Sequence, residues 1–104
     1  MIKSLKIAAN KYQVINKGAL GLYGYCDTST HQICLGERAK TPKARALTIL
    51  HEAVHAICEE YGINQYMTDA SEELVVRAIE IAVANLFAEN KSFATEFVKA
   101  VTKP

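Results

Sequence analysis

Two histidines and one glutamate form the pattern in this sequence that is best suited to chemistry. They are His51, Glu52 and His55, in the order His-Glu-x-x-His. Residues four apart in an α-helix lie on the same face, so both imidazoles can reach one metal ion. Glu52 lies about 100 degrees further round the helix, where its carboxylate can reach a water on the metal without taking a coordination position. The spacing therefore predicts zinc binding by the histidines and general-base catalysis by Glu52.

A catalytic zinc site needs a third protein ligand, because three protein groups bind the ion and one position is left for water. A metzincin would have Gly at position 58 and His at position 61, but the chain has Cys58 and Tyr61. We therefore expect a gluzincin-type glutamate from a later helix. Glu72 shares a helical face with apolar residues, whereas Glu73 groups with charged ones. Glu72 is the favoured ligand and Glu73 the alternative, unless both only stabilise the helix dipole.

Four other side chains are weaker candidates for the site, namely Cys58, His31, Tyr61 and Tyr66. Cys58 follows His55 by three residues and could join the two histidines as a ligand, although a buried apolar thiol is the commoner role. His31 precedes a predicted strand, and a hairpin folded over the cleft could bring it to the metal. Either tyrosine could donate a hydrogen bond to an oxyanion, but tyrosines at such positions are more often packing residues.

The residues around the motif predict the helix that must hold it. Thr41 can cap a helix and Pro42 suits its first position, while Gly62 supplies a left-handed stop. Between them, apolar residues recur every three or four positions. They are Leu47, Leu50, Val54, Ile57 and Tyr61. The motif should therefore lie in the middle of this helix.

Two further helices are predicted after it. One begins at Ser71 as N-cap and ends near Asn90, and the next begins at Ser92 and extends through Val101. The apolar face of the first of these two helices is wide enough to pack on another helix. It consists of Val75, Val76, Ile79, Val83 and Leu86.

The first 40 residues predict strands, because glycines punctuate them and no helical apolar stripe is present. Candidate strands are residues 12–15, 21–26 and 32–35, with a turn at 27–30. They predict an antiparallel hairpin or meander. The expected fold class is α+β: a small N-terminal antiparallel sheet followed by three helices, zincin-like in minimal form, as a single domain over residues 1–104.

The composition is that of a soluble globular protein, with 50% hydrophobic and 22% charged residues. Apolar stretches are too short to cross a bilayer, and no secretory signal is visible. The three cysteines lack a CxxC spacing and fit free thiols in a reducing compartment. We therefore expect a cytoplasmic protein without a membrane partner.

Charge is distributed unevenly along the chain. Residues 1–50 contain eight Lys or Arg and two Asp or Glu, whereas residues 51–104 contain four and nine. A basic half could attract nucleic acid through its phosphates. Its lysines are scattered and no nucleic-acid motif accompanies them, so a nucleic-acid partner is not expected.

The helix at residues 46–57, the Ser-Glu-Glu-Leu-Val-Val-Arg segment at 71–77 and a Gly-Tyr-Cys-Asp turn together resemble a known family. The chain is similar over about residues 7–90 to short phage and prophage metallopeptidase-like proteins, and through them to minimal gluzincins and the ImmA/IrrE metallopeptidases. The resemblance implies zinc ligation by His51, His55 and a downstream glutamate such as Glu72, with Glu52 as base. The chain lacks the Glu-Ala-Asn stretch of the ImmA/IrrE group, so the choice between Glu72 and Glu73 stays open. It also lacks a fused DNA-binding domain, so the family's link to repressor cleavage does not carry over.

Two functions are compatible with these observations. The first is a zinc-dependent metallopeptidase that acts on a peptide or protein substrate, which an edge strand could bind by β-augmentation. The second is a metal-stabilised but catalytically silent interaction module of a phage or mobile element, since metals often supplement small cores. Histidines that merely face solvent or a satisfied core would support neither function.

Overall fold

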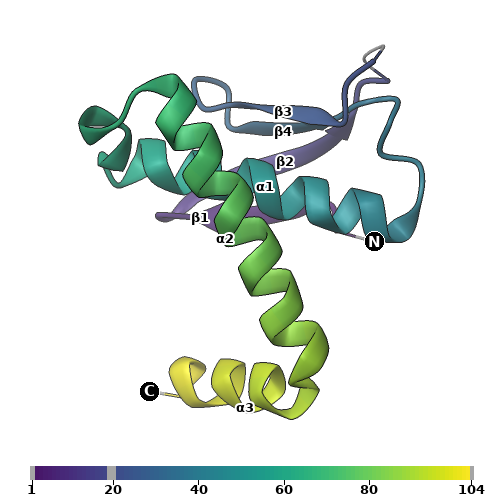
Figure 1. Ribbon diagram of the computed structural model, residues 1–104, viewed down its shortest axis with the longest axis vertical. Coiled ribbons are helices and arrows are strands. Elements are labelled where there is room, and N and C mark those ends of the chain that lie inside the picture. The colour runs from purple at the N-terminus through teal and green to yellow at the C-terminus, as the bar shows by residue number, and fades with distance from the viewer. Residues whose placement is uncertain (1, 19–20, 104) are drawn as a thin grey trace.

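The computed structural model describes residues 2–18 and 21–103. Within them, a four-stranded sheet comes first and three α-helices follow (Figure 1). The strands are β1 (Ser4–Ile7), β2 (Asn10–Asn16), β3 (Gly24–Asp27) and β4 (Gln32–Leu35). The helices are α1 (Pro42–Glu60), α2 (Asp69–Glu89) and α3 (Lys91–Thr102), with a short 3-10 turn, η1 (Ile63–Tyr66), before α2. This order confirms the predicted α+β class.

The sheet has the strand order β1-β2-β4-β3. The two outer pairs are antiparallel, as predicted for β3 and β4, but β2 and β4 are parallel, with Val14 opposite Ile33. The chain passes from β2 to the far edge, forms β3, and returns through β4. Hydrophobic patterns locate strands but do not fix which strands pair, so this crossover was not visible in the sequence. Its consequence is that β3 is an edge strand.

The first hairpin was also missed, because its turn lacks the usual residues. Ile7 pairs with Asn10, so Ala8 and Ala9 alone connect β1 to β2. Both alanines have positive φ, 50° and 70°, where Asn and Gly are the usual residues. An L-residue with a Cβ costs about 1–2 kcal/mol in this conformation. The rest of the fold therefore holds this turn in place.

We expect the double substitution Ala8→Asn and Ala9→Gly to raise the free energy of unfolding by about 1 kcal/mol, because Asn-Gly suits a type I′ turn. Urea denaturation would measure the change. Ala46→Gly is a suitable control, since a glycine within helix α1 should instead destabilise by about 0.5–1 kcal/mol. A loss of stability in the turn variant would show that the strain is absent.

Helix α1 begins and ends where the sequence predicted. The Thr41 side chain accepts a hydrogen bond from the backbone N–H of Ala44 at 3.0 Å, and Pro42 is the first helical residue. Gly62 has a φ of 73° just beyond the C-terminus. A well-capped helix thus carries the histidine motif.

Figure 1 shows α1 lying against the sheet. The residues it buries there are Ile49, Ala53 and Ala56. Their partners in the core are Ile7, Tyr12, Ile33, Leu35 and Ala39. The predicted apolar face is only partly correct, since Ile57 is 38% and Tyr61 is 65% exposed. Small alanines allow the sheet to lie close to the helix, so the buried face is not the one with the largest apolar residues.

Helix α2 begins three residues before the predicted position. Thr68, not Ser71, is the N-cap, and the two residues form a capping box: the Thr68 side chain accepts from the Ser71 N–H at 3.1 Å. The Ser71 side chain in turn accepts from the Thr68 N–H at 2.9 Å. Glu72 therefore lies in the first turn of the helix with Glu73 directly after it, and the capping box holds the backbone that carries both.

Helix α2 crosses α1 and then extends away from the sheet to α3 (Figure 1). Val76 is its one fully buried residue among those described, and it packs on Val54 and Cys58 of α1. Helix α3 contacts the end of α2 through Phe93, whose ring centroid lies 6.5 Å from that of Phe87. No helix in the described residues is long and apolar enough to cross a membrane.

Candidate metal centre

His51 and His55 lie one turn apart on α1, on the side that α2 covers. Their ring centroids are 5.1 Å apart, and both side chains are mostly buried. One ligand atom from each histidine and one from Glu73 all lie within 4.8 Å of one another. Two imidazoles and a carboxylate thus converge on one point between the two helices.

The carboxylate of Glu73 lies between the two histidines. Its Oε1 is 2.8 Å from Nε2 of His51, and its Oε2 is 2.9 Å from Nε2 of His55. Arg77, one turn later on α2, lies 3.8 Å from the same carboxylate. Both histidines therefore direct the same nitrogen, Nε2, to a single acidic group.

The other nitrogen of each histidine has a separate carboxylate partner. Nδ1 of His51 is 2.8 Å from Oε1 of Glu80, and Nδ1 of His55 is 2.6 Å from Oε2 of Glu72. An Nδ1–H that donates to a carboxylate leaves the Nε2 lone pair free for a metal and orients the ring. Glu72 and Glu80 therefore occupy the positions of carboxylates that support metal-binding histidines.

These contacts also shift the pKa of His55. Burial lowers the pKa of His55, but its hydrogen bonds with Glu72 and Glu73 outweigh burial, so the pKa lies above its ordinary value. The raised pKa means that the two carboxylates stabilise a positive charge at this position. A cation in the same place would have the same carboxylates to interact with.

The donor set fits a divalent metal ion. Two imidazole nitrogens and one carboxylate oxygen are the protein ligands of several catalytic zinc sites. Four carboxylates surround the pair of imidazoles, and Arg77 is the cation paired with them in the described residues. They are Glu52, Glu72, Glu73 and Glu80. A dication would offset this excess of negative charge.

Glu52 lies next to the histidines but does not belong to the converging group. It is 8% exposed. Burial raises the pKa of its carboxyl group, although His51 and His55 act in the opposite direction. A raised pKa brings a carboxylate closer to the value at which it exchanges protons effectively near neutral pH.

The site geometry agrees with what the whole sequence matches. A peptidase family model, described as the IrrE N-terminal-like domain, matches residues 7–96. The chain belongs to this family. The match includes the histidine motif on α1 and the carboxylates on α2. No curated protein and no solved structure matches the chain.

In this IrrE N-terminal-like domain, the candidate metal centre opens into a cavity of about 670 Å³. The loop before β3, the first half of α1 and the middle of α2 line it. His51, Glu52, Glu73 and Glu80 form its polar side. The volume is in the range of pockets that bind small ligands, about 300–1,000 Å³. A substrate group could therefore approach the converging ligands.

Glu72, the favoured third ligand from the sequence, contacts Nδ1 of His55, whereas Glu73 reaches Nε2 of both histidines. Glu80 was grouped with Glu73 on the charged face of the helix in the sequence analysis and was not considered for the site. It lies seven residues after Glu73, which is about two helical turns. This spacing, which puts both carboxylates on one face of the helix, was the one feature of the sequence that could have indicated a role for Glu80 near the histidines.

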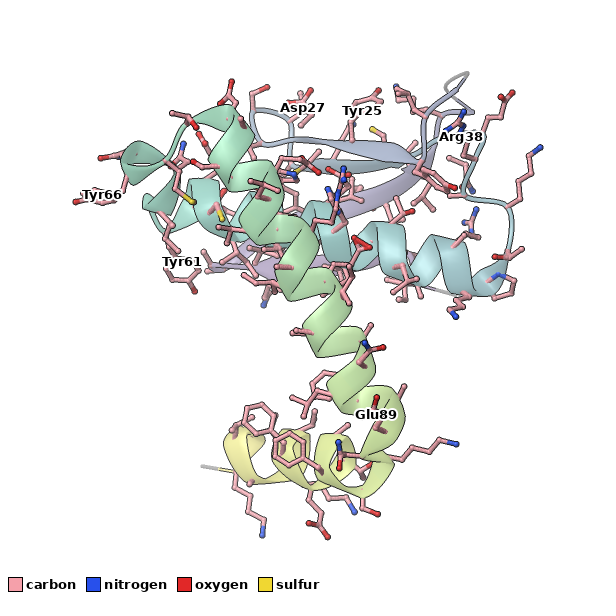
Figure 2. All side chains as sticks on the ribbon, in the orientation of Figure 1. Tyr25, Asp27, Arg38, Tyr61, Tyr66 and Glu89 are labelled. Atoms are coloured by element: carbon pink, nitrogen blue, oxygen red, sulfur yellow. The ribbon has the colours of Figure 1, made fainter. Side chains whose placement is uncertain are left out.

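The four weaker candidates lie elsewhere in this IrrE N-terminal-like domain. His31 is 3.7 Å from Glu60, at the C-terminal end of α1. Cys58 is buried in an apolar cluster with Val54 and Val76, as the simpler interpretation of a buried thiol predicted. Tyr61 and Tyr66 are both exposed near η1, at the end of the molecule remote from the cavity (Figure 2).

Proposed function

We propose that this IrrE N-terminal-like domain is a zinc-dependent metallopeptidase of the gluzincin type, with His51, His55 and Glu73 as ligands and Glu52 as general base. The observation that carries the proposal is the convergence of the three donor groups within 4.8 Å. The open cavity beside them supports a catalytic site and not only a structural one, because structural zinc sites are usually closed.

Zinc is the preferred ion because imidazole nitrogens together with one carboxylate suit it better than they suit magnesium or calcium. Glu73 is the proposed third ligand because its two oxygens lie at the Nε2 atoms of both histidines. Glu72 and Glu80 then have supporting roles at Nδ1.

In the proposed reaction, a zinc ion supplies Lewis-acid activation of water and of the peptide carbonyl group. Glu52 accepts the proton of the attacking water as the new C–O bond forms. The same carboxyl group then donates this proton to the leaving amine as the C–N bond breaks. The position of Glu52 in the cavity wall, together with its raised pKa, suits both transfers.

Zinc content and stability test the metal part of this proposal. Protein purified without chelators should take up one zinc ion, and zinc at a hundred times its Kd should stabilise the fold by about 2.7 kcal/mol. His55→Ala should lose both effects. Wild-type protein that takes up no zinc would contradict the proposal. Zinc uptake without any peptide cleavage would instead favour the silent interaction module.

The supporting carboxylates provide a second prediction. Glu80→Gln and Glu72→Gln should each lower zinc affinity about 10- to 100-fold, because a neutral amide orients and polarises the imidazole less well. Competition with a chromophoric chelator would measure the affinity. Glu89→Gln is the matched control, since Glu89 is exposed on the same helix near its junction with α3 (Figure 2). Unchanged affinity in both test variants would remove the supporting role.

A further inference from the structure

One side of the cavity is lined by apolar residues that do not belong to the buried core clusters. Leu22 and Tyr23 come from the loop before β3, Leu47 from α1, and Ile81 from α2. Leu22, Tyr23 and Ile81 are 47%, 55% and 56% exposed. Large apolar side chains from three separate segments thus line one cavity while they remain open to solvent. Such an arrangement is typical of a binding site for an apolar group.

The loop that carries Leu22 and Tyr23 is held in place. The Gly36 N–H donates to the Tyr23 carbonyl at 2.7 Å, and the Arg38 N–H donates to the Leu22 carbonyl at 2.9 Å. A Cβ at Gly36 would lie 2.3 Å from the Leu22 carbonyl oxygen, so the close contact requires glycine. The Arg38 guanidinium also lies over the Tyr23 ring, 5.8 Å from its centroid. The apolar wall is therefore formed before any ligand binds.

The apolar wall is continuous with the metal centre. Leu47 lies one turn before His51 on α1, so both side chains are on the same helical face. Ile81 directly follows Glu80, whose carboxylate contacts His51 at 2.8 Å. A peptide group bound next to His51 would therefore place a neighbouring side chain between Leu47 and Ile81.

Charged groups at the cavity do not compete for this position. Glu80 is already in contact with His51, and Arg77 pairs with Glu73. Lys43 lies at the far end of the lining, about one turn before Leu47 and about two turns before His51 on α1. The space next to the histidines is thus bounded by apolar side chains on one side and by already paired groups on the other.

We propose that Leu22, Tyr23, Leu47 and Ile81 form a specificity subsite for a large apolar side chain, such as Leu or Phe, of the residue that flanks the scissile bond. This inference rests on the proposed zinc peptidase function. It names the class of substrate: peptides with a large apolar residue at the cleavage position. Polar residues of the same size are disfavoured, because Leu22, Leu47 and Ile81 offer their amide or carboxyl groups no hydrogen-bond partner.

Two small metal-chelating probes test the subsite without requiring catalysis. N-acetyl-leucine hydroxamate and N-acetyl-asparagine hydroxamate have side chains of nearly the same shape, and both carry the same chelating group. Zinc-loaded protein should bind the leucine probe at least about tenfold more tightly. Calorimetry would give both affinities. Equal affinities, or tighter binding of the asparagine probe, would overturn the subsite.

Variants then test the residues. Ile81→Gln should reduce the preference for the leucine probe to less than about threefold, with unchanged zinc affinity. Val98→Gln is the control, because Val98 is 57% exposed on α3 and lies outside the cavity lining. Equal preference in the two variants would overturn the assignment of Ile81 to the subsite.

A mixed peptide library separates this inference from the proposed function. Zinc-loaded wild type should cleave bonds flanked by Leu, Phe, Met or Ile. Cleavage without preference for the flanking residue would overturn the subsite but leave the peptidase function in place. No cleavage together with a retained preference for the leucine probe would overturn the peptidase function and support the subsite. Absence of zinc uptake would overturn both.

Discussion

Glu73→Gln is expected to lower zinc affinity more than about a thousandfold, whereas Glu72→Gln lowers it no more than about a hundredfold. The difference follows from the atoms that each carboxylate contacts. Both oxygens of Glu73 lie within 3 Å of an Nε2 atom, at 2.8 and 2.9 Å, whereas Glu72 contacts the Nδ1 atom of His55. A metal bound by both Nε2 atoms would lose a direct ligand in the first variant and only an orienting hydrogen bond in the second.

The two variants are matched in charge, size and position, because the residues are adjacent on α2. Competition with a chromophoric chelator at fixed pH and salt would give both affinities, and circular dichroism would show whether each variant keeps its helices. The reverse order, with Glu72→Gln as the more severe change, would make Glu72 the ligand, as the sequence analysis favoured. Equal losses would indicate that both carboxylates bind the ion directly.

The histidine motif and its helix could be predicted from the sequence because both depend on local rules. Thr41, Pro42 and Gly62 determine where α1 begins and ends, and a spacing of four residues places His51 and His55 on one face. These features need no knowledge of the rest of the fold. The same holds for β3 and β4, which a short turn connects.

The proposed third ligand could not be predicted in this way, because apolar residues do not mark the face of α2 that contacts α1. Val76 is buried there, but Ile79, assigned to the same face, is 38% exposed. Glu72 and Glu80 lie four residues on either side of Val76, and Glu73 is adjacent to Glu72. Carboxylates that contact histidines thus occupy the face that apolar residues would otherwise fill. The Glu73 side chain is 42% exposed and that of Glu72 is 18%, in the order that the sequence predicted, so the error lies in expecting the ligand on the more buried face. Glu80, which the sequence grouped with Glu73 on the charged face, is only 18% exposed.

The specificity subsite depends even more on tertiary structure. Leu22 and Ile81 are far apart in the sequence and line the same cavity. The edge position of β3 follows from the parallel pairing of β2 and β4, which the strand patterns did not reveal. The loop that leads into β3 lies beside α1 as a result. In a wholly antiparallel meander, β3 would lie between β2 and β4, and this loop would be a hairpin turn between two neighbouring strands.

Glu52→Gln is expected to lower kcat/KM for a peptide with a leucine at the cleavage position about a hundred- to ten-thousandfold. Glutamine keeps the shape of the side chain but cannot accept and return a proton. Zinc affinity should change less than about threefold, because Glu52 supplies no atom to the converging group, whereas loss of a supporting residue costs about tenfold or more. The split between lost activity and retained metal distinguishes a base from a ligand.

Glu59→Gln serves as the control for this variant, because Glu59 is an exposed residue of the same helix, seven positions later, and accepts a hydrogen bond from Asn64. Its kcat/KM should equal that of wild type within about twofold, since surface changes away from a site have small effects. Cleavage by Glu52→Gln at the wild-type rate would exclude Glu52 as base. Loss of zinc together with activity would make Glu52 part of the metal site. Its charge and its burial beside His51 and His55 would allow this role. The positions of the donor atoms speak against it, because Glu52 is not in the converging group.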